Sequence, residues 1–205
     1  MSRIKTLIFD FGDVFINLDK KGAINKALTL FGIDTFPEDL NTINHRYEKG
    51  LINTKEFLEF YTSRFPNLNE SIILEAWNYI LKDFPKHRFE FIYQLRKSNT
   101  FNIILLSNTN ELHIDWIKHR VDFFEDFKQC FHQFYLSHEI GLRKPDTEIY
   151  EFVLTQNQLN PSSCLFVDDL KENTESASKL SINTWNINPE TEDVTKLFEI
   201  NSHLF

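Results

Sequence analysis

The chain has 205 residues, of which 41% are hydrophobic, and a formal net charge of -8 at pH 7. This length suffices for one well-packed domain with an insertion or for two small domains. The acidic balance disfavours binding to nucleic acid and to anionic membranes, because both reward clustered Lys and Arg. The sequence shows neither a signal-peptide stretch nor an apolar run of about 20 residues, so we expect a cytoplasmic protein outside the membrane.

The first predicted element is a buried strand that ends on a carboxylate. Residues 6–9 (TLIF) have the composition of a strand covered on both faces, and Asp10 follows directly. Parallel sheets bind ligands at the carboxyl ends of their strands, which makes Asp10 a candidate functional residue. A lone Asp in this place is more often a turn or helix-cap residue, so other parts of the chain must decide.

A helical block follows the first strand. Gly12 permits a tight turn, and residues 14–16 have the composition of a short extended flap. Helical periodicity with flanking cap and stop residues, including Thr54 as an expected N-cap, then predicts helices over 20–31, 37–48, 55–65 and 70–84. No strand is expected between them. We therefore predict an inserted four-helix domain over residues 17–85, with hinges at both junctions.

Strands and helices alternate in the rest of the chain. We expect strands at 102–106, 133–136, 164–167 and 182–187, and helices at 87–97, 111–120, 147–156, 172–180 and 193–200. This alternation predicts an α/β fold, a Rossmann-like sandwich with a mainly parallel sheet, in which residues 1–16 and 86–205 form the core domain. Cys130 and Cys164 lie beside aromatic or apolar residues, as buried thiols in a reducing compartment do.

Four polar clusters lie at or near the ends of these strands: Asp10, Ser107 with Asn108, Lys144, and Asp168 with Asp169 and Asn173. The carboxyl ends of parallel strands share one edge of the sheet, so the clusters can meet there. Converging carboxylates invite a hard cation such as Mg²⁺, and a lysine and a helix N-terminus can hold a phosphate. Phosphoryl transfer needs these groups.

Each cluster also has a purely structural explanation. Ser107 and Asn108 could cap a helix, and Lys144 could be a solvated loop residue. Asp168 and Asp169 are harder to explain in this way, because two adjacent acids repel each other unless a neighbour compensates. The combination is therefore more informative than any one member.

The sequence resembles the haloacid dehalogenase superfamily in four ordered motifs: residues 9–14 (FDFGDV), 106–110 (LSNTN), 141–150 (GLRKPD and IY) and 166–169 (FVDD) with Asn173. The match spans nearly the whole chain and is most similar to small phosphatases of the glucose 1-phosphate type and to the phosphatase domain of soluble epoxide hydrolases. The resemblance implies Mg²⁺-dependent hydrolysis of a small-molecule phosphate ester, such as a sugar phosphate, through an aspartyl phosphate. It also implies that the helical insertion is a cap domain.

The resemblance assigns roles to the matched positions. Asp10 would be the nucleophile, and Lys144 would assist catalysis. The residues that would hold the phosphoryl group are Ser107, Asn108 and Lys144. The Mg²⁺ ligands would be Asp10, the carbonyl of Gly12, and Asp169. The secondary candidates are Asp13, Asp168 and Asn173.

Gly12 departs from the pattern of this family. Most of its phosphatases carry an Asp at this place, which protonates the leaving group and later activates water. The neighbouring Asp13 could take over this role, although a turn residue is the interpretation we prefer. Dehalogenases lack that Asp too, but their last motif also lacks the metal-binding acidic pair, so Asp168 and Asp169 argue against dehalogenation.

Other functions stay open at this point. A catalytically weak or inactive binding or regulatory protein of this fold is the main alternative, because Gly12 removes a catalytic group, and a 2-haloacid dehalogenase is a less favoured one. A signalling receiver domain uses similar groups, but there the acidic pair comes first in the chain. Within the insertion, His45, Arg46 and Lys49 are candidates for contact with the substrate, and His113 is a candidate for the cleft.

Overall fold

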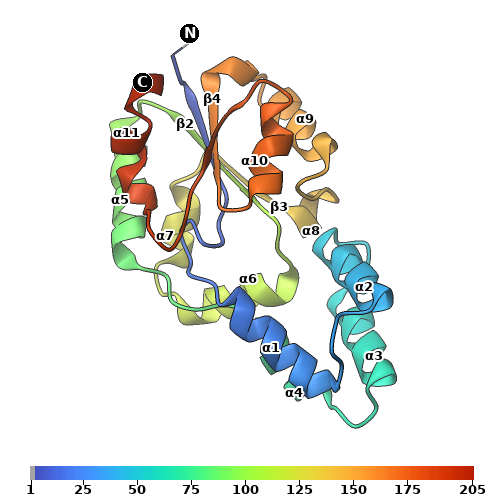
Figure 1. Cartoon of the computed structure of the whole chain (residues 1–205). Coiled ribbons are helices and arrows are strands. Elements are labelled where there is room, and N and C mark those ends of the chain that lie inside the picture. Colours follow the sequence, from blue (N-terminus) through green and yellow to red (C-terminus); the bar gives the residue numbers. More distant parts are fainter. Residues whose placement is uncertain (1–2) are drawn as a thin grey trace.

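A computed structural model describes residues 3–205 (Figure 1). Its strands form one sheet in the order β3-β2-β1-β4-β5, and every pairing between these strands is parallel. The strands are β1 (Thr6–Phe9), β2 (Asn102–Ser107), β3 (Gln133–Leu136), β4 (Cys164–Asp168) and β5 (Asn183–Asn186). The α/β fold with a parallel sheet is therefore confirmed. β1 occupies the centre of the sheet, which places Asp10 between the polar ends of β2 and β4.

Helices cover both faces of the sheet (Figure 1). One face carries α5 (Lys86–Ser98), α6 (Glu111–Arg120), α7 (Phe124–Gln129) and α11 (Leu197–Ile200). The other face carries α8 (Ser137–Ile140), α9 (Thr147–Gln156) and α10 (Lys171–Ser178). Strand side chains alternate between the two cores, so that Leu7 and Phe9 join the first core and Ile8 joins the second. Both cysteines are free and buried.

The first core depends on a cluster of phenylalanine rings around Phe127. Its ring centroid lies 5.3 Å from that of Phe11, 5.0 Å from Phe15, 4.8 Å from Phe84 and 4.9 Å from Phe131. Phe11 and Phe15 belong to the turn after Asp10. The cluster therefore anchors the segment that leaves the end of β1.

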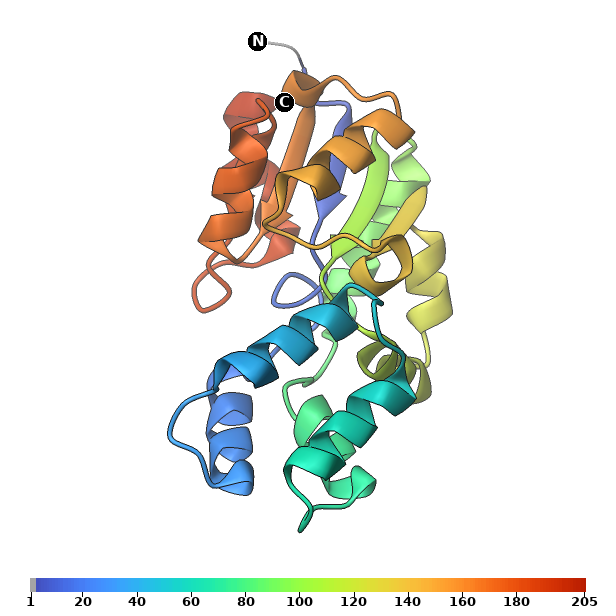
Figure 2. The ribbon, with the colours of Figure 1, turned by 90° about the vertical axis from the view of Figure 1, so that its right-hand side faces the viewer.

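Helices α1 to α4, here called the helical insertion, lie together beyond the carboxyl ends of the strands (Figure 2). They are α1 (Lys20–Phe31), α2 (Glu38–Glu48), α3 (Thr54–Arg64) and α4 (Glu70–Asn78). They pack around an aromatic core of their own, in which Tyr47, Phe57 and Tyr61 are buried. The insertion thus faces the edge of the sheet at which Asp10 lies.

The two chain segments that join the insertion to the sheet run side by side. The N–H of Asn17 donates to the carbonyl of Asp83 at 2.9 Å, and the N–H of Asp19 donates to the carbonyl of Ile80 at 2.8 Å. The predicted extension of the fourth helix to residue 84 is therefore wrong, because residues 80–83 pair with the other segment and α4 ends at Asn78.

Local details of the insertion and of the turn before it also differ from the prediction. Asn53, rather than Thr54, caps α3 in a reciprocal capping box with Glu56. Residues 13–15 form a turn rather than an extended flap, because the N–H of Phe15 donates to the carbonyl of Phe11 at 2.9 Å. Within residues 3–205, no helix has both the length and the apolar character that crossing a bilayer requires.

Phe127→Ala is expected to lower the free energy of unfolding by roughly 3 to 5 kcal/mol, because it removes the ring that joins the cluster and leaves a cavity. Urea unfolding measures this loss. Phe198→Ala is the matched control, because Phe198 is 38% exposed and should cost less than half as much. Equal losses in the two variants would contradict a special role for the Phe127 cluster.

Candidate active site

Asp10 is held at the centre of the sheet edge. It directly follows β1, and its N–H donates to the carbonyl of Val167 on β4 at 2.9 Å. Its side chain is buried, and its Oδ1 lies 2.8 Å from Nζ of Lys144. A lysine from a loop 134 positions later is thereby brought to the carboxylate that ends the first strand.

The ammonium group of Lys144 is almost completely enclosed and has three oxygen partners. Besides Asp10, it lies 2.6 Å from Oδ2 of Asp168 and donates to the carbonyl of Leu106 at 2.8 Å. Burial alone would lower the pKa of Lys144, but the two carboxylates raise it above its ordinary value. Lys144 therefore carries a stable positive charge in the middle of the site.

Asp168 is fully buried, and both of its oxygens are occupied by protein donors. Asn173 on α10 donates to Oδ1 at 2.9 Å and to Oδ2 at 3.0 Å, and the N–H of Leu170 donates to Oδ1 at 2.8 Å. Because Lys144 also binds Oδ2, both oxygens of Asp168 have few positions left at which a ligand could bind. The arrangement suits a residue that holds Lys144 in place, and Asn173 orients that residue.

Asp169 points to a different partner, Lys20 at the start of α1. Nζ of Lys20 contacts Oδ2 of Asp169 and lies 2.9 Å from Oδ2 of Asp13. The other oxygen of Asp13 accepts the N–H of Leu18 at 2.9 Å, so Asp13 closes a turn as well as pairing with Lys20. Lys20 carries no sequence signal of its own, because a lysine in the first turn of a polar helix resembles a surface residue.

Three carboxylates gather where a cation would bind. One oxygen from each of Asp10, Asp168 and Asp169 lies within 4.8 Å of the others. Within the described residues 3–205, Lys144 engages only one oxygen of Asp10 and Lys20 only one oxygen of Asp169. Such carboxylate oxygens are the ligands that Mg²⁺ prefers, so the donor set fits a magnesium ion.

Gly12 packs closely against Leu18. A Cβ added at Gly12 would lie 2.7 Å from Cδ1 of Leu18, which is too close for a normal contact. An Asp at position 12 would therefore need the end of the flexible Leu18 side chain to move.

Burial raises the pKa of Asp10 from 3.8 to about 7. The negative charges of Asp168 and Asp169 act in the same direction, whereas Lys144 opposes them. A cation bound between Asp10 and Asp169 would favour the ionised form, which is the form that can act as a nucleophile.

Ser107 and Asn108 do not cap the following helix. Asn110 caps α6 instead, because its side chain accepts the N–H of His113 at 3.1 Å. The amide of Asn108 brackets Lys144, donating to its carbonyl and accepting its N–H, both at 2.8 Å. Ser107 is buried at the end of β2, beside the carbonyl that receives Lys144.

The helical insertion forms ion pairs with the loop that carries Lys144, on both sides of that residue. Glu48 pairs with Arg143 at 3.1 Å, and Nζ of Lys49 pairs with Asp146 at 2.6 Å. Lys49 is therefore engaged with the loop rather than free to meet a substrate.

The other candidates on or near the insertion differ in exposure. His45 and Arg46 lie on an exposed part of α2. His113 stacks on Trp77, and burial lowers the pKa of His113 to about 4, so this side chain is neutral near pH 7.

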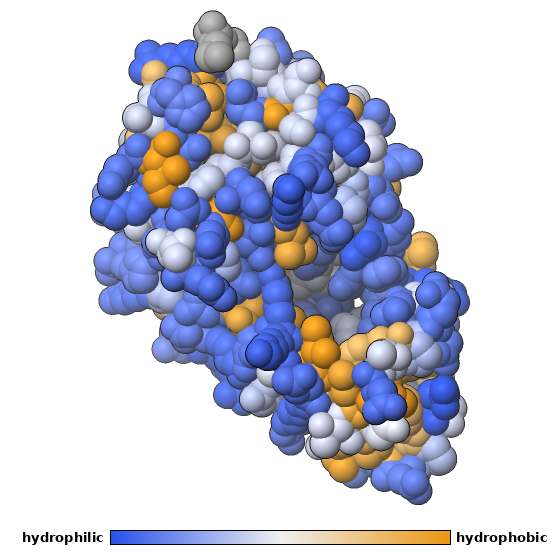
Figure 3. All heavy atoms as spheres, in the orientation of Figure 1, coloured by the Kyte–Doolittle hydropathy of each residue, from blue (hydrophilic) through white to orange (hydrophobic). Residues whose placement is uncertain are grey.

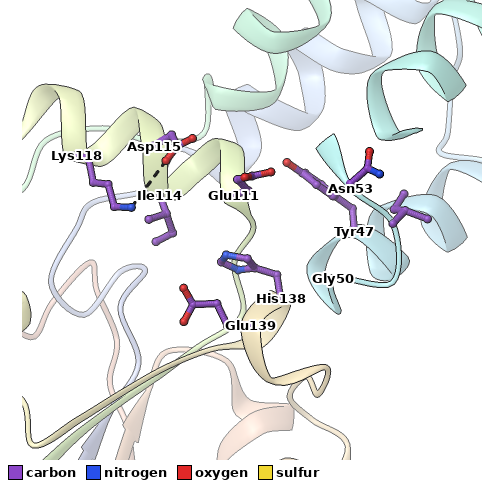
Figure 4. Close-up of a pocket in the computed structure, with 10 residues that line it drawn as sticks. Tyr47, Gly50, Asn53, Glu111, Ile114, Asp115, Lys118, His138 and Glu139 are labelled. Carbon is purple, nitrogen blue, oxygen red and sulfur yellow. Dashed lines mark ion pairs between the residues drawn. The ribbon is translucent and has the colours of Figure 1, made fainter. Parts of the chain in front are cut away.

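A cavity of about 370 Å³ also lies between the insertion and the core (Figure 4). Figure 4 shows Glu111, Asp115 and Lys118 from α6 facing His138 and Glu139 from α8, with Tyr47 and Asn53 of the insertion on the other side. None of the predicted site residues lines this cavity, so it is separate from the carboxylate cluster.

The family model of the haloacid dehalogenase-like hydrolases matches residues 4–179. The chain belongs to this family of hydrolases. It is 30% identical over 193 residues to a D-ribitol-5-phosphate phosphatase of Bacteroides thetaiotaomicron, covering 89% of this chain and 91% of the relative.

Solved structures agree with this assignment. A magnesium complex of a haloacid dehalogenase family enzyme from Bacteroides thetaiotaomicron is 31% identical, with a TM-score of 0.84 over 96% of this chain and 99% of that one. The wild-type enzyme is also solved with magnesium and inorganic phosphate, at 29% identity, a TM-score of 0.79, and coverage of 95% of this chain and 99% of that chain. A dehalogenase structure with 17% identity and a TM-score of 0.61, over 98% of both chains, shares the fold alone.

With magnesium chelated, Asp10→Asn should stabilise this hydrolase above pH 7. The pKa of Asp10 is about 7 in the folded chain and 3.8 when unfolded, so the folded state binds the extra proton between these values and loses stability as the pH rises through them. The ionised carboxylate then costs roughly 2 to 4 kcal/mol, and an amide avoids this cost. Urea unfolding from pH 4 to 8, with exposed Asp122→Asn as control, measures it. Parallel curves for wild type and Asp10→Asn would contradict the raised pKa.

Proposed function

We propose that the chain is a magnesium-dependent phosphatase that hydrolyses a small phosphomonoester through an aspartyl phosphate on Asp10. The observation that carries this proposal is the convergence of Asp10, Lys144 and Asp169 at one edge of the sheet. The similarity to a sugar-alcohol phosphate phosphatase, and the magnesium and phosphate complexes of related enzymes, support it.

Asp10 would attack phosphorus with one of its two carboxylate oxygens, leaving the other for the magnesium ion. The bond from phosphorus to the alcohol oxygen breaks, and water later attacks the aspartyl phosphate to release inorganic phosphate. Lys144 would neutralise the charge of the phosphoryl oxygens, with Asp168 and Asn173 keeping its ammonium group in place.

The phosphoryl group would also be held by the end of β2. The hydroxyl of Ser107 and the backbone N–H groups before α6 suit this role, and Asn108 would contribute by fixing the Lys144 loop. Magnesium would be held by Asp10, Asp169 and the carbonyl of Gly12, and it would supply neutralising charge. The role of all these groups would be to bind and orient the phosphate, and none of them would donate or accept a proton.

Position 12 offers no general acid, because Gly12 has no side chain. Asp13 is tied to Leu18 and Lys20, which suits a turn residue better than an acid. We therefore propose that esters with acidic, easily displaced alcohols react fastest, because their leaving groups need less protonation. A binding or regulatory protein with little turnover is the second candidate, and the lack of an acid at Gly12 favours it.

We further propose that residues 17–85 act as a cap domain over a core of residues 1–16 and 86–205. The paired linkers, residues 17–19 and 80–83, would form the hinge. A closed cap would keep water away from the reacting phosphate.

The alcohol part of the substrate would lie in a cavity of about 180 Å³ between the cap helices and α6. The cavity is lined mainly by apolar side chains, among them Ala27 of α1 and Ile80 of the linker after α4, with Asn44, Glu48 and His113 as polar groups. Figure 3 shows apolar side chains gathered on this part of the molecule. The carbon skeleton of a sugar or sugar-alcohol phosphate would pack on these walls, and its hydroxyls would meet the polar groups.

Short chain segments connect the lining of the cavity to the proposed phosphate site. Ala23, which lines it, is one turn from Lys20, and Glu48 pairs with Arg143, the neighbour of Lys144. A cytoplasmic location and the absence of a nucleic-acid partner complete the proposal, supported by the two free thiols and the net charge of -8.

Asp10→Asn should reduce the magnesium-dependent hydrolysis of acetyl phosphate and p-nitrophenyl phosphate by roughly 1,000-fold or more, because it removes the nucleophile. Chelation of magnesium should have a similar effect on wild type, and Asp122→Asn is the matched control. Equal background hydrolysis by wild type and Asp10→Asn would favour the binding protein instead.

Ala27→Phe should raise the KM for sugar phosphates about tenfold, because it fills the cap cavity. Acetyl phosphate is too small to need the cavity, so its kcat/KM should change little. Thr29→Phe on the exposed side of α1 serves as the control. Identical selectivity in wild type and Ala27→Phe would remove the cavity from the proposal.

A further inference from the structure

Lys20 connects the helical insertion to a carboxylate of the cluster. It opens α1 directly after the linker at 17–19, and its Nζ reaches Asp169 at the end of β4. These two residues are 149 positions apart in the chain. A single side chain thus links the first turn of the proposed cap to one of the proposed magnesium ligands.

Other contacts between the insertion and the core involve residues outside the carboxylate cluster. Glu48 and Lys49 hold the loop around Lys144, and Nε1 of Trp77 donates to Asn110 at 3.1 Å. Among the ion pairs within residues 3–205 that join the insertion to the core, it is that of Lys20 which reaches the three-carboxylate cluster. Lys20 is therefore placed to respond to whatever binds there.

The position of Lys20 is set by the turn after Asp10. Asp13 lies 2.9 Å from Nζ of Lys20 and is itself held by the N–H of Leu18. Asp19 caps α1 by accepting the N–H of Gly22 at 2.8 Å, which fixes the helix start. The ammonium group is consequently directed at Asp169 from both its own helix and the core.

An ammonium group and a magnesium ion draw on the same negative charge when they share a carboxylate. Both are cations, so they also repel each other. We propose that Lys20 is a positioning residue that couples the cap to the metal site. Its ion pair with Asp169 holds the start of α1 at the site, and magnesium binding to Asp169 weakens this ion pair. This inference rests on the proposed function, because it requires Asp169 to be a magnesium ligand.

The coupling is reciprocal, since two binding events that share one carboxylate alter each other by the same factor. Magnesium loosens the start of α1, and loss of the Lys20 contact strengthens magnesium binding. The linkers at 17–19 and 80–83 are the segments that would transmit this change, because Lys20 follows the first of them directly.

Calorimetric titration of the full chain with MgCl₂ tests the coupling. Lys20→Met should bind magnesium about fivefold or more tightly than wild type. Lys20→Arg keeps the charge and should stay close to wild type, and Lys21→Met removes an exposed charge from the next position of α1 and should change little. Magnesium should also speed hydrogen exchange of residues 17–19 and 80–83 in wild type but not in Lys20→Met.

Unchanged or weaker magnesium binding by Lys20→Met would overturn the coupling while leaving the metal site intact. Equal tightening in Lys21→Met would overturn it as well, because long-range charge would then explain both effects. Absence of magnesium binding to wild type and to every variant would contradict the proposed metal site itself, and the coupling with it.

Discussion

The buried ammonium group of Lys144, placed between Asp10 and Asp168, is the interaction on which the site depends. Two ionised acids at the centre of the sheet edge would repel each other, and an isolated lysine in the same place would be costly to bury. In the folded chain the opposite charges compensate each other. The carbonyl of Leu106 accepts a further hydrogen bond from Lys144, and Asn173 donates to Asp168. Because the loop with Lys144 must reach the end of β1, the folding of the whole sheet is required before this charge balance exists.

That loop also joins the sheet to the helical insertion. Asn108 holds the backbone of Lys144 from the core side, while Glu48 and Lys49 hold its neighbours Arg143 and Asp146 from the insertion. A shift of the insertion would therefore act on the segment that carries the central charge. Through this loop, and through the contact of Lys20 with Asp169, the helical insertion is linked to the carboxylate cluster.

The turn after Asp10 combines Gly12 with two residues that have structural contacts. Leu18 lies against the position where an acid would begin, and Asp13 is committed to the turn and to Lys20. Around Asp10, the proposed nucleophile, the groups therefore suit binding and neutralising a phosphate better than donating a proton.

The sequence by itself determined the features that depend on near neighbours. The helix over 20–31 with Gly32 after it, the strand before Asp10 and the order of the four motifs follow from local periodicity, caps and spacing, and the structure has these elements at the predicted positions. Tertiary structure alone decided the end of α4, because residues 80–83 find their hydrogen-bond partners in residues 17–19. It also separated the adjacent acids, directing Asp168 to Lys144 and Asp169 to Lys20, since these partners lie far away in the chain and are chosen only when the strands and the insertion come together.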